Sequence, residues 1–231
     1  MKDIGSRMSI AILPFAHKGI VSPVGEIIYD VLIESFDNLR RFNIVARREE
    51  LESVLEELKL SQTDLVDESK ALKVGKMVAA EAILSGSVIE TERDIEVIAR
   101  LINTETTTVM ATKDVYGQDK SLSYLHYLLN GLALKFKHAF PLVEGLVIKV
   151  KGKEVFADLG KNRNLKKEMK FIIYREGEKV VHPVTGKFLV YDTKVLGEAT
   201  VVQVFEEFSK GKLKIAKGLP KIYEKDRVIT K

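Results

Sequence analysis

Apolar residues in the first 140 positions recur at two different spacings. Helical spacing (i, i+3, i+4, i+7) predicts amphipathic helices, and short apolar runs between turn residues predict strands. We expect helices over residues 24–40, 47–59, from Asp67 onward, and 122–140. We expect strands over residues 9–15, 42–46, 82–90, 95–103 and 107–116.

The order of these segments restricts how the strands pair. The first two strands flank a helix, which implies a right-handed parallel crossover. The three strands between residues 82 and 116 are joined by tight polar turns, which predicts an antiparallel meander. Gly86 lies inside the first of them, where a glycine indicates a bulge or a close backbone approach. We therefore expect a mixed sheet, and we expect Gly86→Val to damage folding.

The pattern changes after Pro141, where short strand-like runs alternate with Gly, Asn or Pro turns. The runs are GLVIKV, EVFADL, KFIIYR, GKFLVY, EATVVQVF and KLKIAK. A small closed or partly open β-barrel is expected, because closure hides strand edges. The predicted fold is a mixed-sheet α/β domain over residues 9–140, followed by a small all-β barrel domain over residues 143–231.

Composition narrows the classes of protein that fit. An apolar content of 45% and a charged content of 30% are typical of a globular chain. The absence of cysteine excludes disulfides, thiolate nucleophiles, cysteine-based zinc sites and iron–sulfur clusters. No apolar run is long enough for a transmembrane helix. The opening MKDIGSRM has no apolar core, so we expect no secretory signal in this chain.

The net charge of +4 conceals an asymmetry between the two parts. Residues 1–143 hold 17 basic and 21 acidic side chains, whereas residues 144–231 hold 20 and 12. A basic barrel suggests an anionic partner. The candidate anionic-partner surface is a run of basic residues: Lys149, Lys151, Lys153, Lys161, Arg163, Lys166, Lys167 and Lys170. Three aromatic residues, Phe156, Phe171 and Tyr174, lie within the run or just after it; strand alternation makes them core candidates as well.

Catalytic chemistry has no support in the motifs. The histidines (His17, His126, His138 and His182) lack metal-ligand spacing, and the chain has no nucleophile elbow, Walker A or dinucleotide-binding motif. Pairs of carboxylates occur at Glu49-Glu50, Glu56-Glu57 and Glu206-Glu207, where solvated surface positions are the simplest interpretation. We expect no enzyme, and no catalytic, cofactor-binding or metal-binding residue.

Residues 9–140 resemble the CsgG-like family of bacterial envelope proteins, which is related in fold to the N-terminal domain of TolB. The resemblance rests on the motifs IAILPF, SFDNLRRFNIVARREELESVLEELKL, ALKVGKMVAAEAILSGSV and IARLINTETTTVMAT, in this order. It implies an α/β fold without catalysis. The short turns of the predicted meander disfavour a CsgG-like secretion pore, which needs long hairpins.

Residues 143–231 resemble the C-terminal domain of the FlgT family, whose members help to build a ring around the flagellar basal body. The matching segments are EGLVIKVKGKEVFADLGKNRNLKKEMKFIIYREGE, HPVTGKFL, LGEATVVQV and KDRVI. Two turn positions depart from the family pattern. A glycine expected between Asn162 and Lys167 is missing, and Lys225 replaces a glycine before Asp226.

The two resemblances imply a non-enzymatic envelope protein, periplasmic or outer-membrane-associated. It would act as a FlgT-like structural or assembly factor through protein–protein contacts in a flagellar or export assembly. We expect envelope or flagellar proteins as partners; a homo-oligomer and peripheral membrane association stay open, and no cofactor is expected. The alternative is a binding module whose basic β-barrel recognises an anionic polymer, either nucleic acid, which ranks lower, or cell-wall glycan. An enzyme of unrecognised type is the weakest interpretation.

Overall fold

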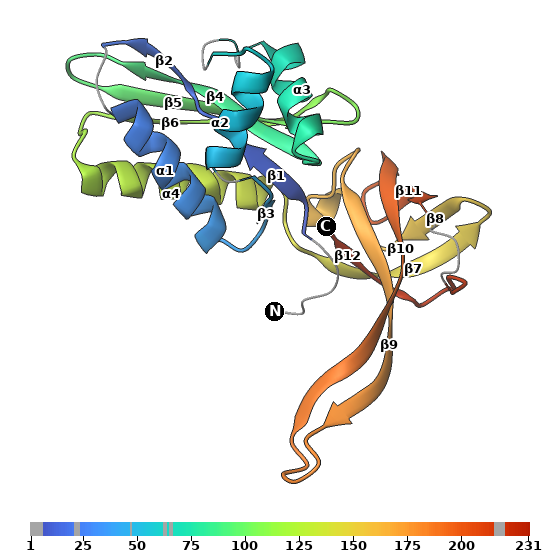
Figure 1. Ribbon diagram of the computed structural model, residues 1–231. Helices are drawn as coiled ribbons and strands as arrows, with labels where there is room; N and C mark the ends of the chain where they lie inside the picture. Colours follow the sequence, from blue (N-terminus) through green and yellow to red (C-terminus); the bar gives the residue numbers. More distant parts are fainter. Residues whose placement is uncertain (1–6, 21–23, 47, 62–63, 65–66, 215–219) are drawn as a thin grey trace. The chain divides into compact units, whose positions relative to one another are not determined.

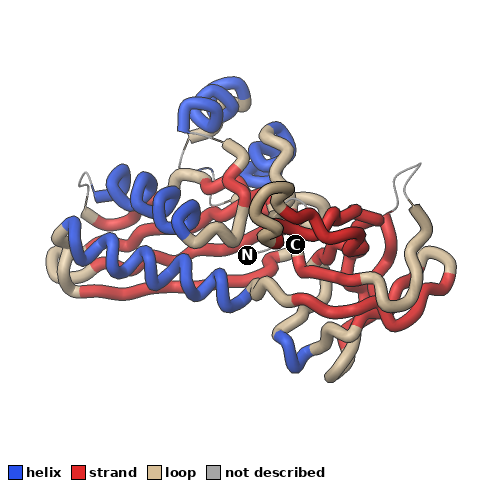
Figure 2. The backbone as a smooth tube through the Cα atoms, turned by 90° about the horizontal axis from the view of Figure 1, so that it is seen from below, coloured by secondary structure: helices blue, strands red, loops and turns tan. Residues whose placement is uncertain are grey.

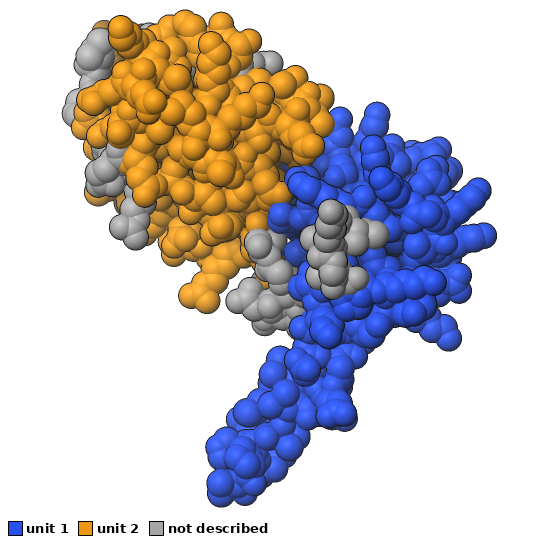
Figure 3. All heavy atoms as spheres, turned by 45° about the vertical axis from the view of Figure 1, so that its right-hand side comes forward, with its two compact units in different colours: residues 1–6, 140–231 blue, residues 7–139 orange. Residues whose placement is uncertain are grey.

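The computed structural model describes residues 7–20, 24–46, 48–61, 64, 67–214 and 220–231. Its described residues fall into two compact units, one within residues 7–139 and the other within residues 140–231 (Figure 3). We call them the α/β unit and the barrel unit, and we describe each by itself.

The α/β unit is built on a six-stranded mixed sheet. The strands are β1 (Ser9–Ile12), β2 (Ala16–Gly19), β3 (Asn43–Ile44), β4 (Ala82–Glu90), β5 (Ile95–Asn103) and β6 (Val109–Gly117). They lie in the order β3-β1-β4-β5-β6, with β2 also paired to β4. β1 is parallel to β3 and β4, and β4, β5 and β6 form an antiparallel meander. The predicted crossover and meander are both confirmed.

The described residues of this unit form four helices: α1 (Val24–Asn38), α2 (Arg48–Glu57), α3 (Glu68–Met77) and α4 (Leu122–Ala139). Helices α1, α3 and α4 contact strands of the sheet, and α2 packs against α3. α1 and α4 lie side by side on one face of the sheet (Figures 1 and 2). The fully buried rings of Phe36 and Phe136 join them, with centroids 5.7 Å apart. Asp67 caps α3, as its sequence predicts, by accepting a hydrogen bond from the backbone N–H of Ser69 at 2.8 Å.

Gly86 makes room for an aromatic ring. The pairing of β4 with β5 runs without a shift, so β4 carries no bulge against β5. A Cβ at Gly86 would lie 2.1 Å from the carbonyl oxygen of Ile98 and 2.6 Å from the Phe15 ring. The interruption is in the neighbouring strand, which breaks between β1 and β2 where Phe15 turns inward. The close approach is confirmed and the bulge was wrong. Residues 16–19, for which no strand was expected, form β2.

The barrel unit is a closed six-stranded barrel in the order β10-β11-β8-β7-β12-β9. Its strands are β7 (Glu144–Lys151), β8 (Glu154–Ala157), β9 (Lys170–Val181), β10 (Phe188–Val204), β11 (Ser209–Lys214) and β12 (Arg227–Thr230), with a short 3-10 helix, η2 (Lys161–Arg163). All neighbouring strands are antiparallel. The fold class predicted from the sequence, a mixed-sheet α/β domain followed by a small all-β barrel, is confirmed.

Two strands of the barrel are longer than predicted. GKFLVY and EATVVQVF belong to one strand, β10, of 17 residues, and β9 continues beyond KFIIYR to Val181. β9 and β10 therefore leave the barrel together as a two-stranded arm (Figure 1). Its residues lack alternating polarity because both faces of the arm are exposed. β12, which was not predicted, closes the barrel between β7 and β9.

The two departures from the FlgT-like pattern fall on left-handed backbone. Asn164 has φ 59° and Lys225 has φ 70°. Glycine adopts this region without steric cost, asparagine tolerates it, and lysine rarely enters it. The expected turns are therefore present, with less favourable residues in them.

Candidate functional site

Three neighbouring strands of the barrel, β11, β8 and β7, present lysines on one face. Directly paired residues of an antiparallel sheet point to the same side. Two rows of such pairs cross the strands: Lys149–Phe156–Lys210 and Lys151–Glu154–Lys212. Lys214, two residues after Lys212, lies on the same side. We call this surface the basic face: Lys149, Lys151, Lys210, Lys212 and Lys214, with Phe156 and Glu154 between them.

Positive charge on the basic face exceeds its compensation. Glu154 is the one carboxylate in these two rows, and its Oε1 lies 2.6 Å from the Nζ of Lys210. The remaining four lysines are exposed, and Phe156 is half-buried between Lys149 and Lys210. Such a face attracts anions over a distance set by ionic strength, and it offers an aromatic contact at its centre.

The basic run predicted from the sequence is divided between two ends of the barrel. The backbone carbonyl of Lys153 accepts from the N–H of Leu213 near the end of β11, whereas the N–H of Lys161 donates to the carbonyl of Phe205 before β11 begins. Lys149, Lys151 and Lys153 lie at the first end, next to the lysines of β11. Lys161, Arg163, Lys166 and Lys167 lie around η2 and the segment before β9, toward the second end, whereas Lys170 lies in register with Lys212 through Thr200 of β10.

Arg163 and Lys170 contact residues of their own chain. Arg163 donates to the backbone carbonyl of Glu144 at 2.7 Å, and the Nζ of Lys170 lies 3.8 Å from the Oε1 of Glu198. Lys167 is exposed. These contacts favour the first end over the second as the place where a partner binds. That the eight residues recognise an anionic partner stays a prediction.

Sequence reasoning missed three of the five lysines of the basic face. Lys210, Lys212 and Lys214 alternate in S-K-G-K-L-K as Lys149 and Lys151 do in V-I-K-V-K, and this period of two was the available signal. Their proximity follows from β8 pairing with both β7 and β11, which the sequence did not reveal. The other two aromatics of the region, Phe171 and Tyr174, are fully buried in the barrel unit.

A buried carboxylate in the α/β unit has a structural role. Glu90, at the end of β4, is 3% exposed; its Oε2 lies 3.0 Å from the Nε2 of His17 and its Oε1 lies 3.1 Å from the Nζ of Lys120. The group joins β2, β4 and the segment before α4. His17 is thus a partly buried partner of Glu90. Among the described residues no cluster of His, Asp and Glu has the arrangement of a metal site.

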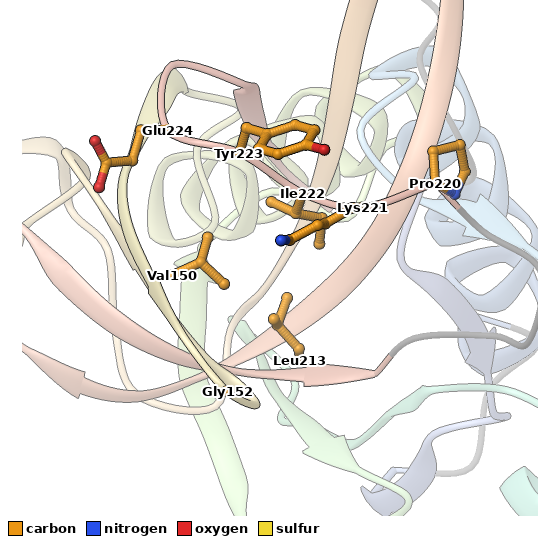
Figure 4. A pocket seen from close by; sticks show the side chains of 8 residues that line it. All are labelled: Val150, Gly152, Leu213, Pro220, Lys221, Ile222, Tyr223 and Glu224. Atoms are coloured by element: carbon orange, nitrogen blue, oxygen red, sulfur yellow. The ribbon is translucent and has the colours of Figure 1, made fainter.

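A hollow of about 740 Å³ opens beside β7 and β11. Its lining consists of Val150, Gly152, Leu213, Pro220, Lys221, Ile222, Tyr223 and Glu224. Figure 4 shows the apolar side chains of Val150, Leu213 and Ile222 around it, and Glu224 directed away. Ligand sites combine an apolar lining with a few convergent polar groups. Because the polar groups of this lining do not converge on the hollow, we assign no small-molecule site to it.

The helices of the described segments include none that is both long and apolar enough to cross a lipid bilayer.

Residues 11–97 match the model of a protein family described as "Curli production assembly/transport component CsgG". A comparison with curated proteins finds no match. Similar solved structures include lipoprotein GNA1162 from Neisseria meningitidis (11% identity, 58% of this chain and 99% of that chain, TM-score 0.46). They also include the LpoB C-terminal domain from Escherichia coli (16%, 52% and 88%, 0.43) and TolB from Acinetobacter baumannii (8%, 94% and 62%, 0.37).

The family match covers fewer than half of the residues of the chain, all within the α/β unit. Residues 11–97 are therefore similar to the CsgG family, as the order of their motifs predicted. The FlgT-like interpretation of residues 143–231 stays a prediction.

Proposed function

We propose that this chain is a non-enzymatic protein of the bacterial cell envelope that acts through contacts with other proteins. It is periplasmic or outer-membrane-associated and serves, like FlgT, as a structural or assembly factor in a flagellar or export assembly. The observation that carries the proposal is the basic face of the barrel, which offers exposed lysines and a half-buried aromatic ring to a partner. The match of residues 11–97 to a family described as an assembly and transport component supports the envelope setting.

The basic face suits an acidic protein surface. Complementary charge accelerates encounter and fixes the register of two partners. The half-buried Phe156 sits among lysines and would be covered on docking, which is the arrangement of an aromatic anchor with a charged rim. A closed barrel holds these side chains on paired strands, so little ordering is required when the partner binds.

The test reverses charge on this face and compares it with a matched surface. Lys149→Glu with Lys212→Glu changes the face, whereas Lys73→Glu with Lys76→Glu makes the same change on exposed positions of α3. Each variant is cross-linked in envelope preparations of the source cell, and captured proteins are identified by mass spectrometry. We expect the parent and the α3 variant to capture the same envelope proteins and the face variant to lose them. Equal capture by all three, or no capture by the parent, would contradict the proposal.

The alternative partner is an anionic polymer, nucleic acid or cell-wall glycan. The observation that favours it is the half-buried ring of Phe156 between Lys149 and Lys210, because single-stranded nucleic acids bind between cations and aromatic platforms. Titration with single-stranded DNA and with purified glycan at several salt concentrations separates the two proposals. Tight binding that weakens steeply with salt, and that is lost in the Lys149→Glu, Lys212→Glu variant, would establish the polymer in place of the protein.

A further inference from the structure

The distal part of the β9–β10 arm exposes large apolar side chains without any cover from the described residues of the chain. We call residues 179–191 the arm tip. Its exposed apolar residues are Val180, Val181, Val184, Phe188, Leu189 and Val190, and their exposed fractions range from 42% to 86%. Contact of so much apolar surface with water is unfavourable. Exposed apolar patches mark surfaces that a membrane or another molecule covers.

Apolar residues occupy both faces of this ribbon. Val181 pairs with Phe188, and Val180 pairs with Val190. Directly paired residues share a face, and neighbours along a strand point to opposite faces. The register of β10 shifts between Phe188 and Val190, so each of these residues follows its own partner on β9, and the ring of Phe188 contacts that of Tyr191, with centroids 5.1 Å apart. The first pair therefore lies on one face and the second on the other. A groove in a protein partner covers one face of a ribbon, whereas a lipid layer surrounds both.

The turn that closes the ribbon satisfies its own backbone donors. The N–H groups of Val184 and Thr185 both donate to the Nδ1 of His182 at 3.2 Å, and that of Gly186 donates to the His182 carbonyl at 2.9 Å. The N–H groups of His182 and Lys187 also have acceptors inside the turn, and the remaining residue is a proline, which has no N–H. A turn whose N–H groups all have acceptors costs less free energy to move into an apolar environment than a turn with unpaired N–H groups.

The charges of the arm tip have one sign. Lys179 and Lys187 lie within it, and no Asp or Glu does. Glu178 and Asp192, both exposed, flank the tip on the two strands. Lysines next to apolar residues favour a membrane with anionic headgroups, and the two flanking carboxylates oppose deeper entry.

The geometry points to insertion of the arm tip into the interfacial layer of an anionic lipid membrane. Depth is limited, because the outer edges of a two-stranded ribbon carry unpaired backbone groups that the hydrocarbon core excludes. An interfacial depth of about 5–10 Å spans roughly two or three residues of each strand at about 3.4 Å per residue, counted from the end of the arm. It covers the turn, approaches the pair Val181 and Phe188, and stops short of the carboxylates.

A fluorescent reporter tests the insertion directly, because the chain contains no tryptophan. Val184→Trp places one at the tip. The matched control is Val109→Trp on the edge strand β6, where the valine is 43% exposed. The full chain is mixed with vesicles of phosphatidylcholine alone or with phosphatidylglycerol. We expect a blue shift of the emission and protection from an aqueous quencher for V184W with the anionic vesicles, and neither change for V109W.

Two further variants separate this inference from binding at the basic face. Val184→Asp with Phe188→Asp should weaken binding to anionic vesicles roughly tenfold or more, because it places charge in the apolar layer. Lys149→Glu with Lys212→Glu, combined with V184W, should keep the blue shift. The inference is overturned if V184W shows no shift with any vesicle, if uncharged vesicles give the same shift, or if the arm variant keeps full vesicle binding and instead loses a protein partner.

Discussion

The two halves of the β9–β10 ribbon are paired along their length, with three shifts of register, and have opposite surroundings. In the half nearer the barrel, Phe171 and Ile173 are fully buried, and they pair with both β10 and β12. In the distal half, Val181 and Phe188 are paired with each other and are about half exposed. The strands therefore continue beyond the end of the core, because a ladder of backbone hydrogen bonds needs only two paired strands. The distal half is ordered by pairing alone, which is a weak source of stability.

A clamp holds the ribbon where it leaves the barrel. The Nε and a terminal nitrogen of Arg175 each lie 2.7 Å from a carboxylate oxygen of Asp226, and the guanidinium stacks on the ring of Tyr223. The buried Asp226 carboxylate also accepts from the backbone N–H of Tyr223 at 2.7 Å. Beside it, the Nε of Arg227 lies 2.9 Å from the Oε2 of Glu176. Bidentate charged hydrogen bonds of this kind fix direction as well as distance.

The largest predicted effect is a difference in lost stability between alanine substitutions at two phenylalanines of the same ribbon. Phe171→Ala removes a fully buried ring and should lower the free energy of unfolding by about 3–5 kcal/mol. Phe188→Ala, in the arm tip, should change it by less than about 0.5 kcal/mol. Urea unfolding of the two variants and the parent measures both values. Similar losses would mean that the arm belongs to the cooperative core.

Alkaline pH should lower the stability of the ribbon half nearer the barrel, because Tyr174 ionises. Burial, and then the charge of Glu144, raise the pKa of the Tyr174 phenol to about 12, above its ordinary value of 10. The neutral phenol thus stabilises the fold fully below about pH 10, and this contribution is lost as pH rises toward 12. It amounts to roughly 2–3 kcal/mol. Between pH 9 and 12 the free energy of unfolding should fall more steeply for the parent than for Tyr174→Phe. Parallel pH profiles for the two proteins would refute the role assigned to Tyr174.

A smaller gain is expected at the turn that precedes the clamp. Lys225 adopts a φ of 70°, which strains a residue with a Cβ and suits glycine. Lys225→Gly should therefore raise the free energy of unfolding, by at most about 1 kcal/mol, because relief of strain is partly offset by greater freedom of the unfolded chain. Lys153→Gly, in another exposed barrel turn with ordinary φ, is the control and should not stabilise. A loss of stability in Lys225→Gly would show that the lysine side chain supports the turn.

Sequence patterns predicted helices and strands well where the burial pattern is uniform along the segment. The bounds of β4 and β5 coincide with those expected, 82–90 and 95–103, because buried strands there end at polar turns. The distal arm was missed because residues exposed on both faces carry no alternation. The contribution of β11 to the basic face was missed for a different reason. The pairing of β8 with β11 joins strands that are distant in sequence, and single-strand periodicity does not encode it.

Replacement of residues 178–191 by Asn-Gly tests the central difference between the two halves most directly. This two-residue turn suits a hairpin and joins the strands just beyond the paired Glu176 and Thr193. Unfolding and binding to anionic vesicles are measured on the same protein. We expect a free energy of unfolding within about 1 kcal/mol of the parent and the loss of vesicle binding. A protein destabilised by several kcal/mol, or one that binds vesicles as the parent does, would contradict it.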